Sequence, residues 1–78
     1  MPAPPLAALK QKCAATHEAF TTASARTLQL LTEVELPVLK ELRGSLLHQL
    51  QVEHEAQERY LAARQELLLF VQEHFRRP

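Results

Sequence analysis

The sequence predicts an all-α protein built from long helices, and its composition carries that prediction. Aspartate, asparagine, isoleucine and tryptophan are absent, and the only glycine is Gly44. The residues that most often reverse the direction of a chain are therefore scarce. Leu, Ala, Glu, Gln and Arg, all strong helix formers, dominate instead.

A flexible, proline-rich lead over residues 1–5 is expected before the first helix. Proline is favoured at the first helical position, so Pro5 is predicted to open a helix over about residues 5–33. Apolar and small residues then recur at alternating spacings of three and four, which is a heptad register. Its members are Leu6, Leu9, Cys13, Thr16, Phe20, Ala23, Thr27, Leu30 and Val34.

A second helix is predicted over about residues 37–76, with a register of its own. That register comprises Leu39, Leu42, Leu46, Gln49, Glu53, Ala56, Tyr60, Ala63, Leu67, Phe70 and His74. An adjacent stripe on the same helix comprises Leu47, Leu50, His54, Leu61, Leu68, Val71 and Phe75. Two neighbouring stripes are wider than a two-stranded contact requires, so this helix is expected to join a bundle of three or four helices.

The signals between the two helices conflict. Thr32 is predicted to cap a new helix, with Glu35 as its capping-box partner. Pro37 then stands where it would clash with the carbonyl of Glu33, so a break is expected within residues 31–37. No glycine or asparagine stands nearby to make a tight loop, which favours a long kinked rod of coiled-coil segments that partners complete into a bundle. The alternative is an αα-hairpin. Gly44 is a lesser candidate for a break and is expected to mark close packing.

The histidines and the single cysteine do not fall into catalytic or metal-binding motifs. His54 opens a sequence like that of zinc-protease helices, but Glu58 stands where the second histidine is needed. Cys13 and His17 are four residues apart and could pair as nucleophile and base, yet no third orienting group is evident. We therefore expect no catalytic residue, no cofactor and no metal site.

Charge and hydropathy restrict the partners. Nine Lys and Arg balance nine Glu, so the net charge of zero gives no reason to expect nucleic acid. No apolar run approaches the roughly 20 residues of a transmembrane helix. A lone cysteine fits a reducing compartment, and the first residues lack the pattern of a signal peptide. A cytoplasmic or nuclear location is expected.

The function predicted from these features is that of a non-enzymatic helical subunit, scaffold or adaptor in a multi-protein complex. In architecture alone the chain resembles the short coiled-coil subunits of vesicle and lysosome positioning, kinetochore and microtubule, or meiotic scaffold complexes. Helical partner proteins are favoured; the alternatives are a self-sufficient homodimeric four-helix bundle and an amphipathic lipid-surface binder. The predicted partner interface comprises Leu39, Leu42, Leu46, Leu50, Tyr60, Leu67, Phe70, Val71 and Phe75.

Overall fold

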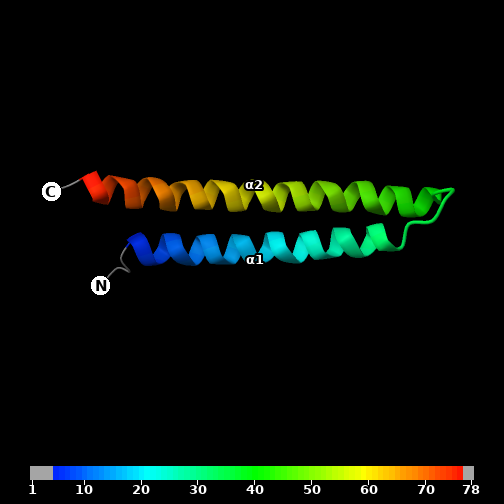
Figure 1. Ribbon diagram of the computed structural model, residues 1–78, viewed down its shortest axis with the longest axis horizontal. Coiled ribbons are helices and arrows are strands. Elements are labelled where there is room, and N and C mark those ends of the chain that lie inside the picture. Colours follow the sequence, from blue (N-terminus) through cyan, green and yellow to red (C-terminus); the bar gives the residue numbers. More distant parts are fainter. Residues whose placement is uncertain (1–4, 77–78) are drawn as a thin grey trace.

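The computed structural model describes residues 5–76 and folds them into two long antiparallel helices that lie side by side (Figure 1). Helix α1 spans Pro5–Thr32 and helix α2 spans Lys40–Arg76, and the described residues contain no strand. The hairpin measures 62 × 25 × 15 Å. The all-α class is confirmed, whereas residues 1–4 of the predicted flexible lead lie outside the described residues.

The αα-hairpin alternative is confirmed, and the extended rod is not formed. The chain reverses over residues 33–39, close to the predicted break. We expected reversal to require a short loop with a residue in left-handed geometry, but no described residue has a positive φ. The connection is long enough to turn the chain without a residue of positive φ, so the scarcity of glycine and asparagine did not prevent reversal.

Thr32 does not cap the second helix as predicted. It is the last residue of α1, and its Oγ1 donates a hydrogen bond to the carbonyl oxygen of Gln29 at 2.7 Å. The amide of Glu33 donates to the carbonyl of Leu30 at 3.2 Å, which tightens the final turn. Thr32 therefore helps to finish α1.

Helix α2 begins a few residues later than predicted. Pro37 disfavours helical geometry at the preceding Leu36, and both residues stay in the connection. The carbonyl of Leu39 accepts the amide of Arg43 at 2.9 Å, so Leu39 occupies the cap position. Its side chain cannot accept a hydrogen bond, and the first turn has only the carboxylate of Glu41 to favour its positive end.

The two predicted registers pack against each other, and we call this contact the seam. From Leu6 to Val34 and from Leu42 to Phe70, every register position is buried or half-buried. Leu39 and His74, at the ends of the second register, are exposed. The buried residues of the described chain are mostly small: Ala23, Thr27, Leu30, Ala56 and Ala63. The hairpin thus covers one stripe on each helix with a thin core.

A distance measurement separates the hairpin from a rod. Lys12 Nζ and Glu66 Oε1 are 3.0 Å apart. Spin labels placed by Lys12→Cys and Glu66→Cys, in a Cys13→Ala background, should lie within about 25 Å, given helix axes about 10 Å apart. A continuous helix would separate the same sites by about 80 Å at its rise of 1.5 Å per residue. Dilution with unlabelled chain removes distances between molecules, and a long distance after dilution would contradict the hairpin.

Gly44 neither breaks α2 nor marks close packing. The helix continues through it, and a Cβ atom at this position would meet nothing within 4 Å. We therefore expect Gly44→Ala to stabilise the hairpin by about 1 kcal/mol, because alanine loses less backbone entropy in a helix. Urea unfolding followed by circular dichroism measures the change. The reverse substitution at an exposed site of α1, Ala25→Gly, is the control and should destabilise by a similar amount; a destabilising Gly44→Ala would indicate an unrecognised contact.

Candidate partner interface

The structure divides the predicted interface residues between the seam and the surface. Five belong to the seam and are half-buried: Leu42, Leu46, Tyr60, Leu67 and Phe70. Leu39, Leu50 and Phe75 are exposed, and Val71 is half-buried beside the seam. The chain's own fold therefore uses part of the predicted surface. Contact of these nine residues with another protein stays a prediction.

Aromatic side chains pack the half of the seam that lies away from the connection. The Tyr60 ring meets His17 edge to face with 5.0 Å between ring centroids, and it stacks on Phe20 at 6.2 Å. Further along α2, the Phe70 and His74 rings are 4.3 Å apart. Ring contacts of this kind contribute about 1 kcal/mol each beyond the apolar area that they bury. The Tyr60 contacts join the helices where no covalent connection holds them.

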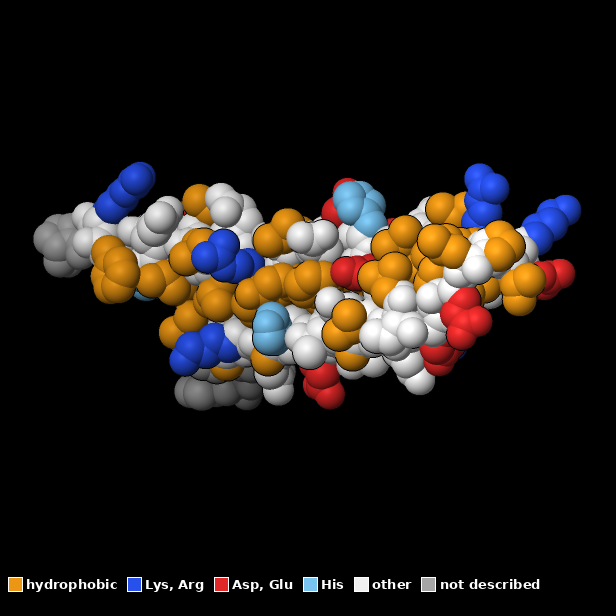
Figure 2. All heavy atoms as spheres, turned by 45° about the vertical axis from the view of Figure 1, so that its right-hand side comes forward, with side chains coloured by type: hydrophobic (Ala, Val, Ile, Leu, Met, Phe, Trp, Pro, Cys, Tyr) orange, Lys and Arg blue, Asp and Glu red, His pale blue; other side chains and the backbone are white. Residues whose placement is uncertain are grey.

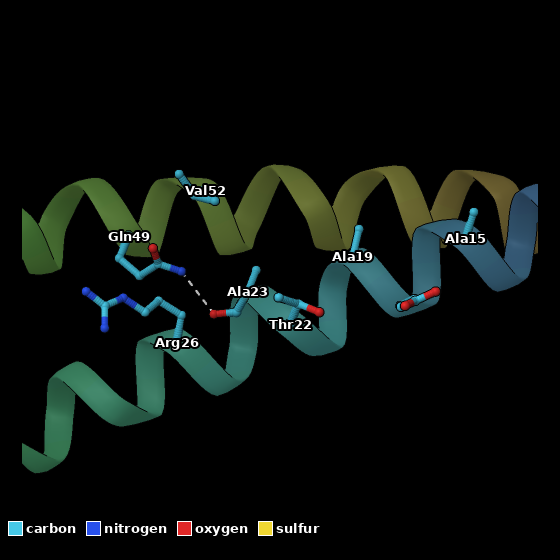
Figure 3. A pocket seen from close by; sticks show the side chains of 8 residues that line it. Ala15, Ala19, Thr22, Ala23, Arg26, Gln49 and Val52 are labelled. Carbon is cyan, nitrogen blue, oxygen red and sulfur yellow. Dashed lines mark hydrogen bonds between the residues drawn. The ribbon is translucent and has the colours of Figure 1, made fainter.

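The middle of the seam is polar. Gln49 Nε2 of α2 donates to the carbonyl oxygen of Ala23 of α1 at 3.0 Å (Figure 3). Thr27 Oγ1 donates to the same oxygen, also at 3.0 Å. One turn further along α2, Glu53 Oε2 is buried without a hydrogen-bond partner. This part of the seam contributes little hydrophobic stabilisation and leaves a buried carboxylate oxygen unsatisfied.

One side of the hairpin carries most of the exposed apolar surface. Residues one position after each seam residue lie on this side of both helices, and we call its apolar members the leucine strip. Its exposed members are Leu28, Leu31, Leu47, Leu50, Leu61, Leu68 and Phe75, seven of the nine large hydrophobic residues exposed within the two helices. Figure 2 shows hydrophobic side chains gathered over the end of the molecule near the connection. The strip is an apolar surface that the chain itself does not cover.

The opposite side is built differently. A hollow of about 570 Å³ lies there between α1 and α2 (Figure 3). Its floor is made of the small residues Ala15, Ala19 and Thr22, and Val52 of α2 borders it. The Lys12–Glu66 salt bridge spans the two helices on the same side. Small side chains and paired charges distinguish this side from the leucine strip.

A smaller hollow of about 380 Å³ opens on the side of the leucine strip. Cys13 and His17, the possible nucleophile and base, both line it together with Tyr60. The remaining lining residues are Lys10, Ala14 and Leu67, so no carboxylate in the hollow can orient His17. Within residues 5–76, no group of three or more His, Cys, Asp or Glu is placed to hold a metal ion.

Several exposed residues of the strip were missing from the predicted interface. Leu47, Leu61 and Leu68 stood in the adjacent stripe of the second helix but were not selected. Leu28 and Leu31 of α1 lie outside the register predicted for that helix. Each of these five leucines stands one position after a seam residue, and the adjacent stripe predicted on the second helix has the same spacing.

The fold defines this chain as an all-α helical hairpin. No protein-family model, curated protein or solved structure matches it. Neither helix in the described part of the chain combines the length and apolar character needed to cross a membrane. Its function must therefore be inferred from the surfaces of the hairpin.

The unsatisfied carboxylate of the seam gives a test of the packing. Glu53→Leu should stabilise the hairpin by about 1–2 kcal/mol, because leucine removes the buried unpaired oxygen and adds apolar contact. The midpoint of thermal unfolding, followed by circular dichroism, measures the gain. The control is Glu55→Leu at an exposed site two residues away, which should change stability by less than about 0.5 kcal/mol. Equal effects of the two substitutions would contradict the placement of Glu53 in the seam.

Proposed function

We propose that the protein is a non-enzymatic helical subunit of a multi-protein complex in the cytoplasm or nucleus. It contributes its hairpin to a larger helical bundle and acts as a scaffold or adaptor through helix contacts. Vesicle and lysosome positioning, kinetochore and microtubule, and meiotic scaffold complexes are the kinds of assembly that use short helical subunits of this architecture.

One observation carries this proposal: the hairpin has too small a core. Among the described residues no large side chain is fully buried, and twelve large hydrophobic residues are exposed. Ordering each residue costs roughly 1.5 kcal/mol, and burial of a few alanines offsets little of that cost. Further helices packed on the hairpin would supply the missing apolar burial.

No hollow in the described part of the chain brings together a set of catalytic side chains, which supports a binding role rather than catalysis. In the larger hollow between the helices, Glu18 and Arg26 are the only charged residues among alanines and other uncharged side chains, and the smaller hollow has Lys10 as its only Lys, Arg, Asp or Glu. The Cys13 and His17 pair has no carboxylate beside it in its hollow, so it lacks the third member of a catalytic triad. The exposed apolar surface of the hairpin, rather than a group of reactive side chains, therefore supports the proposed role.

A homodimeric four-helix bundle is the second candidate function, and the hairpin itself favours it. Two hairpins that pack face to face form a four-helix bundle without any other protein. The outcome depends on whether the exposed strip is complementary to itself or to a different surface.

The isolated chain should be only partly helical at micromolar concentration and should lose its helicity in a broad transition on heating. Adding its partner should raise the helicity, because the partner covers the exposed apolar surface. Circular dichroism and light scattering together make the measurement. A discrete, stable dimer would favour the second candidate, and a fully helical monomer that unfolds cooperatively would contradict both.

A further inference from the structure

The leucine strip has a mostly basic border. Within residues 5–76, five charged residues stand one position after a register residue: Lys10, Lys40, Arg43 and Arg64 are basic, and Glu35 of the connection is acidic. No glutamate occupies these positions in either helix. None of the four basic side chains makes a salt bridge with another residue in the range 5–76. The strip is thus an apolar surface with unpaired positive charges at its edges.

The opposite side of the hairpin has mixed charge. Glu41, Glu55 and Glu66 alternate there with Lys12 and Arg59, and Lys12 is already paired with Glu66 across the helices. The basic border of the strip is therefore a local feature, since the chain as a whole has zero net charge. Charge of one sign around an apolar surface favours a partner surface of the opposite sign.

The apolar positions of the strip follow the repeat of a packed helix. Every seventh residue of α2 from position 47 onward is Leu47, His54, Leu61, Leu68 and Phe75; His54 interrupts this apolar line, and its Nε2 lies 2.9 Å from Glu58 Oε1. Residues at this spacing form a straight line along a helix that supercoils with its neighbours. Beside the line, Tyr60 borders a shallow hollow of the surface. The occupant that matches this shape is another helix with an apolar stripe of the same period.

We propose that the leucine strip is the docking site for an acidic amphipathic helix of another protein. The proposal deepens the proposed function and rests on it, because it names the chemistry of the missing bundle member. The partner presents an apolar stripe to Leu47, Leu61 and Leu68, and glutamate or aspartate side chains beside that stripe pair with Arg43 and Arg64.

The same charges disfavour a second copy of this chain as the occupant. In a two-fold dimer each surface meets its own copy, so the basic border of one strip would lie against the basic border of the other. Glu35 is the one acidic residue at these positions within residues 5–76, so it can offset only part of that repulsion. A lipid surface is also a poorer match, because interfacial helices carry polar faces rich in Lys and Arg, whereas this strip has four such residues over two helices.

The test uses the full chain and a synthetic amphipathic peptide of roughly 28 residues, or four heptads, with leucine in the apolar stripe and glutamate beside it. A matched peptide has lysine in place of each glutamate. Fluorescence anisotropy of the labelled peptides should show binding to the acidic peptide at least about tenfold tighter than to the basic one. The difference should shrink at high salt, because the border charges are exposed. Equal affinity for the two peptides would overturn the proposal.

Two arginines of α2 give a matched pair of charge variants. Arg64 borders the strip and Arg59 lies on the opposite side, and both are exposed. Arg64→Glu should weaken binding of the acidic peptide about tenfold, whereas Arg59→Glu, with the same change in net charge, should alter it less than about twofold. An equal loss in both variants would mean that net charge alone attracts the peptide, which contradicts docking on the strip.

Apolar variants locate the site independently of charge. Leu61→Gln with Leu68→Gln removes two side chains from the strip, and Val52→Gln with Leu69→Gln removes two exposed side chains of α2 from the opposite side. The strip variant should lose binding at least about tenfold, and the other should keep it within about twofold. Circular dichroism of each free variant shows whether the substitutions alter the hairpin itself. Loss of binding in the Val52 and Leu69 variant alone would place the site on the side opposite the leucine strip, which contradicts the proposal.

Two further measurements distinguish the other occupants. Sedimentation of the free chain tests for a dimer, and a dimer abolished by the strip variant would assign the surface to a second copy and overturn the proposal. Vesicles containing phosphatidylserine test the lipid surface, and a gain of helicity on vesicles without preference for the acidic peptide would also overturn it. Binding of either peptide through the opposite side would refute the strip as the site while leaving the role of bundle subunit standing. A cooperatively folded monomer that binds neither peptide would refute both.

Discussion

The packing of α1 against α2 along one stripe per helix is the contact on which the rest of the molecule depends. Two antiparallel helices can cover only the surfaces that face each other, and each helix keeps more than half of its circumference in contact with solvent. In this hairpin the contact buries mainly alanine, threonine and leucine, and large side chains such as Tyr60 and Phe70 stay half-buried. A fold of this thickness buries little apolar surface by itself.

The composition of the seam varies along its length, and this variation has consequences for dynamics. Aromatic contacts around Tyr60 hold the half of the hairpin near the chain ends, and Leu30 is buried close to the connection. Between them, Gln49 and Glu53 replace apolar contact with one interhelical hydrogen bond and one unsatisfied oxygen. Local opening should therefore begin in this polar middle, where the least free energy opposes separation of the helices.

The two sides of the hairpin differ in shape and in charge, and that difference gives the molecule an orientation. The leucine strip is apolar with a basic border, whereas the opposite side is lined by alanines and carries charges of both signs. A helix that packs on one side cannot be exchanged for a helix suited to the other without leaving charges unpaired. Asymmetry of this kind suits a subunit with a fixed place in a bundle of different chains better than one in a symmetric assembly.

The sequence by itself determined the helical class, the approximate bounds of both helices and the two registers of the seam, because helix propensity and heptad spacing are local properties. It also contained both apolar stripes of α2, although the interface residues selected from them mixed seam residues such as Tyr60 with exposed ones such as Phe75. Only the tertiary structure decided that the chain reverses over residues 33–39 and that the two registers meet each other. A reversal without glycine depends on the combined backbone angles of a whole connection and on the packing of segments that are distant along the chain. Neither is visible in local sequence patterns.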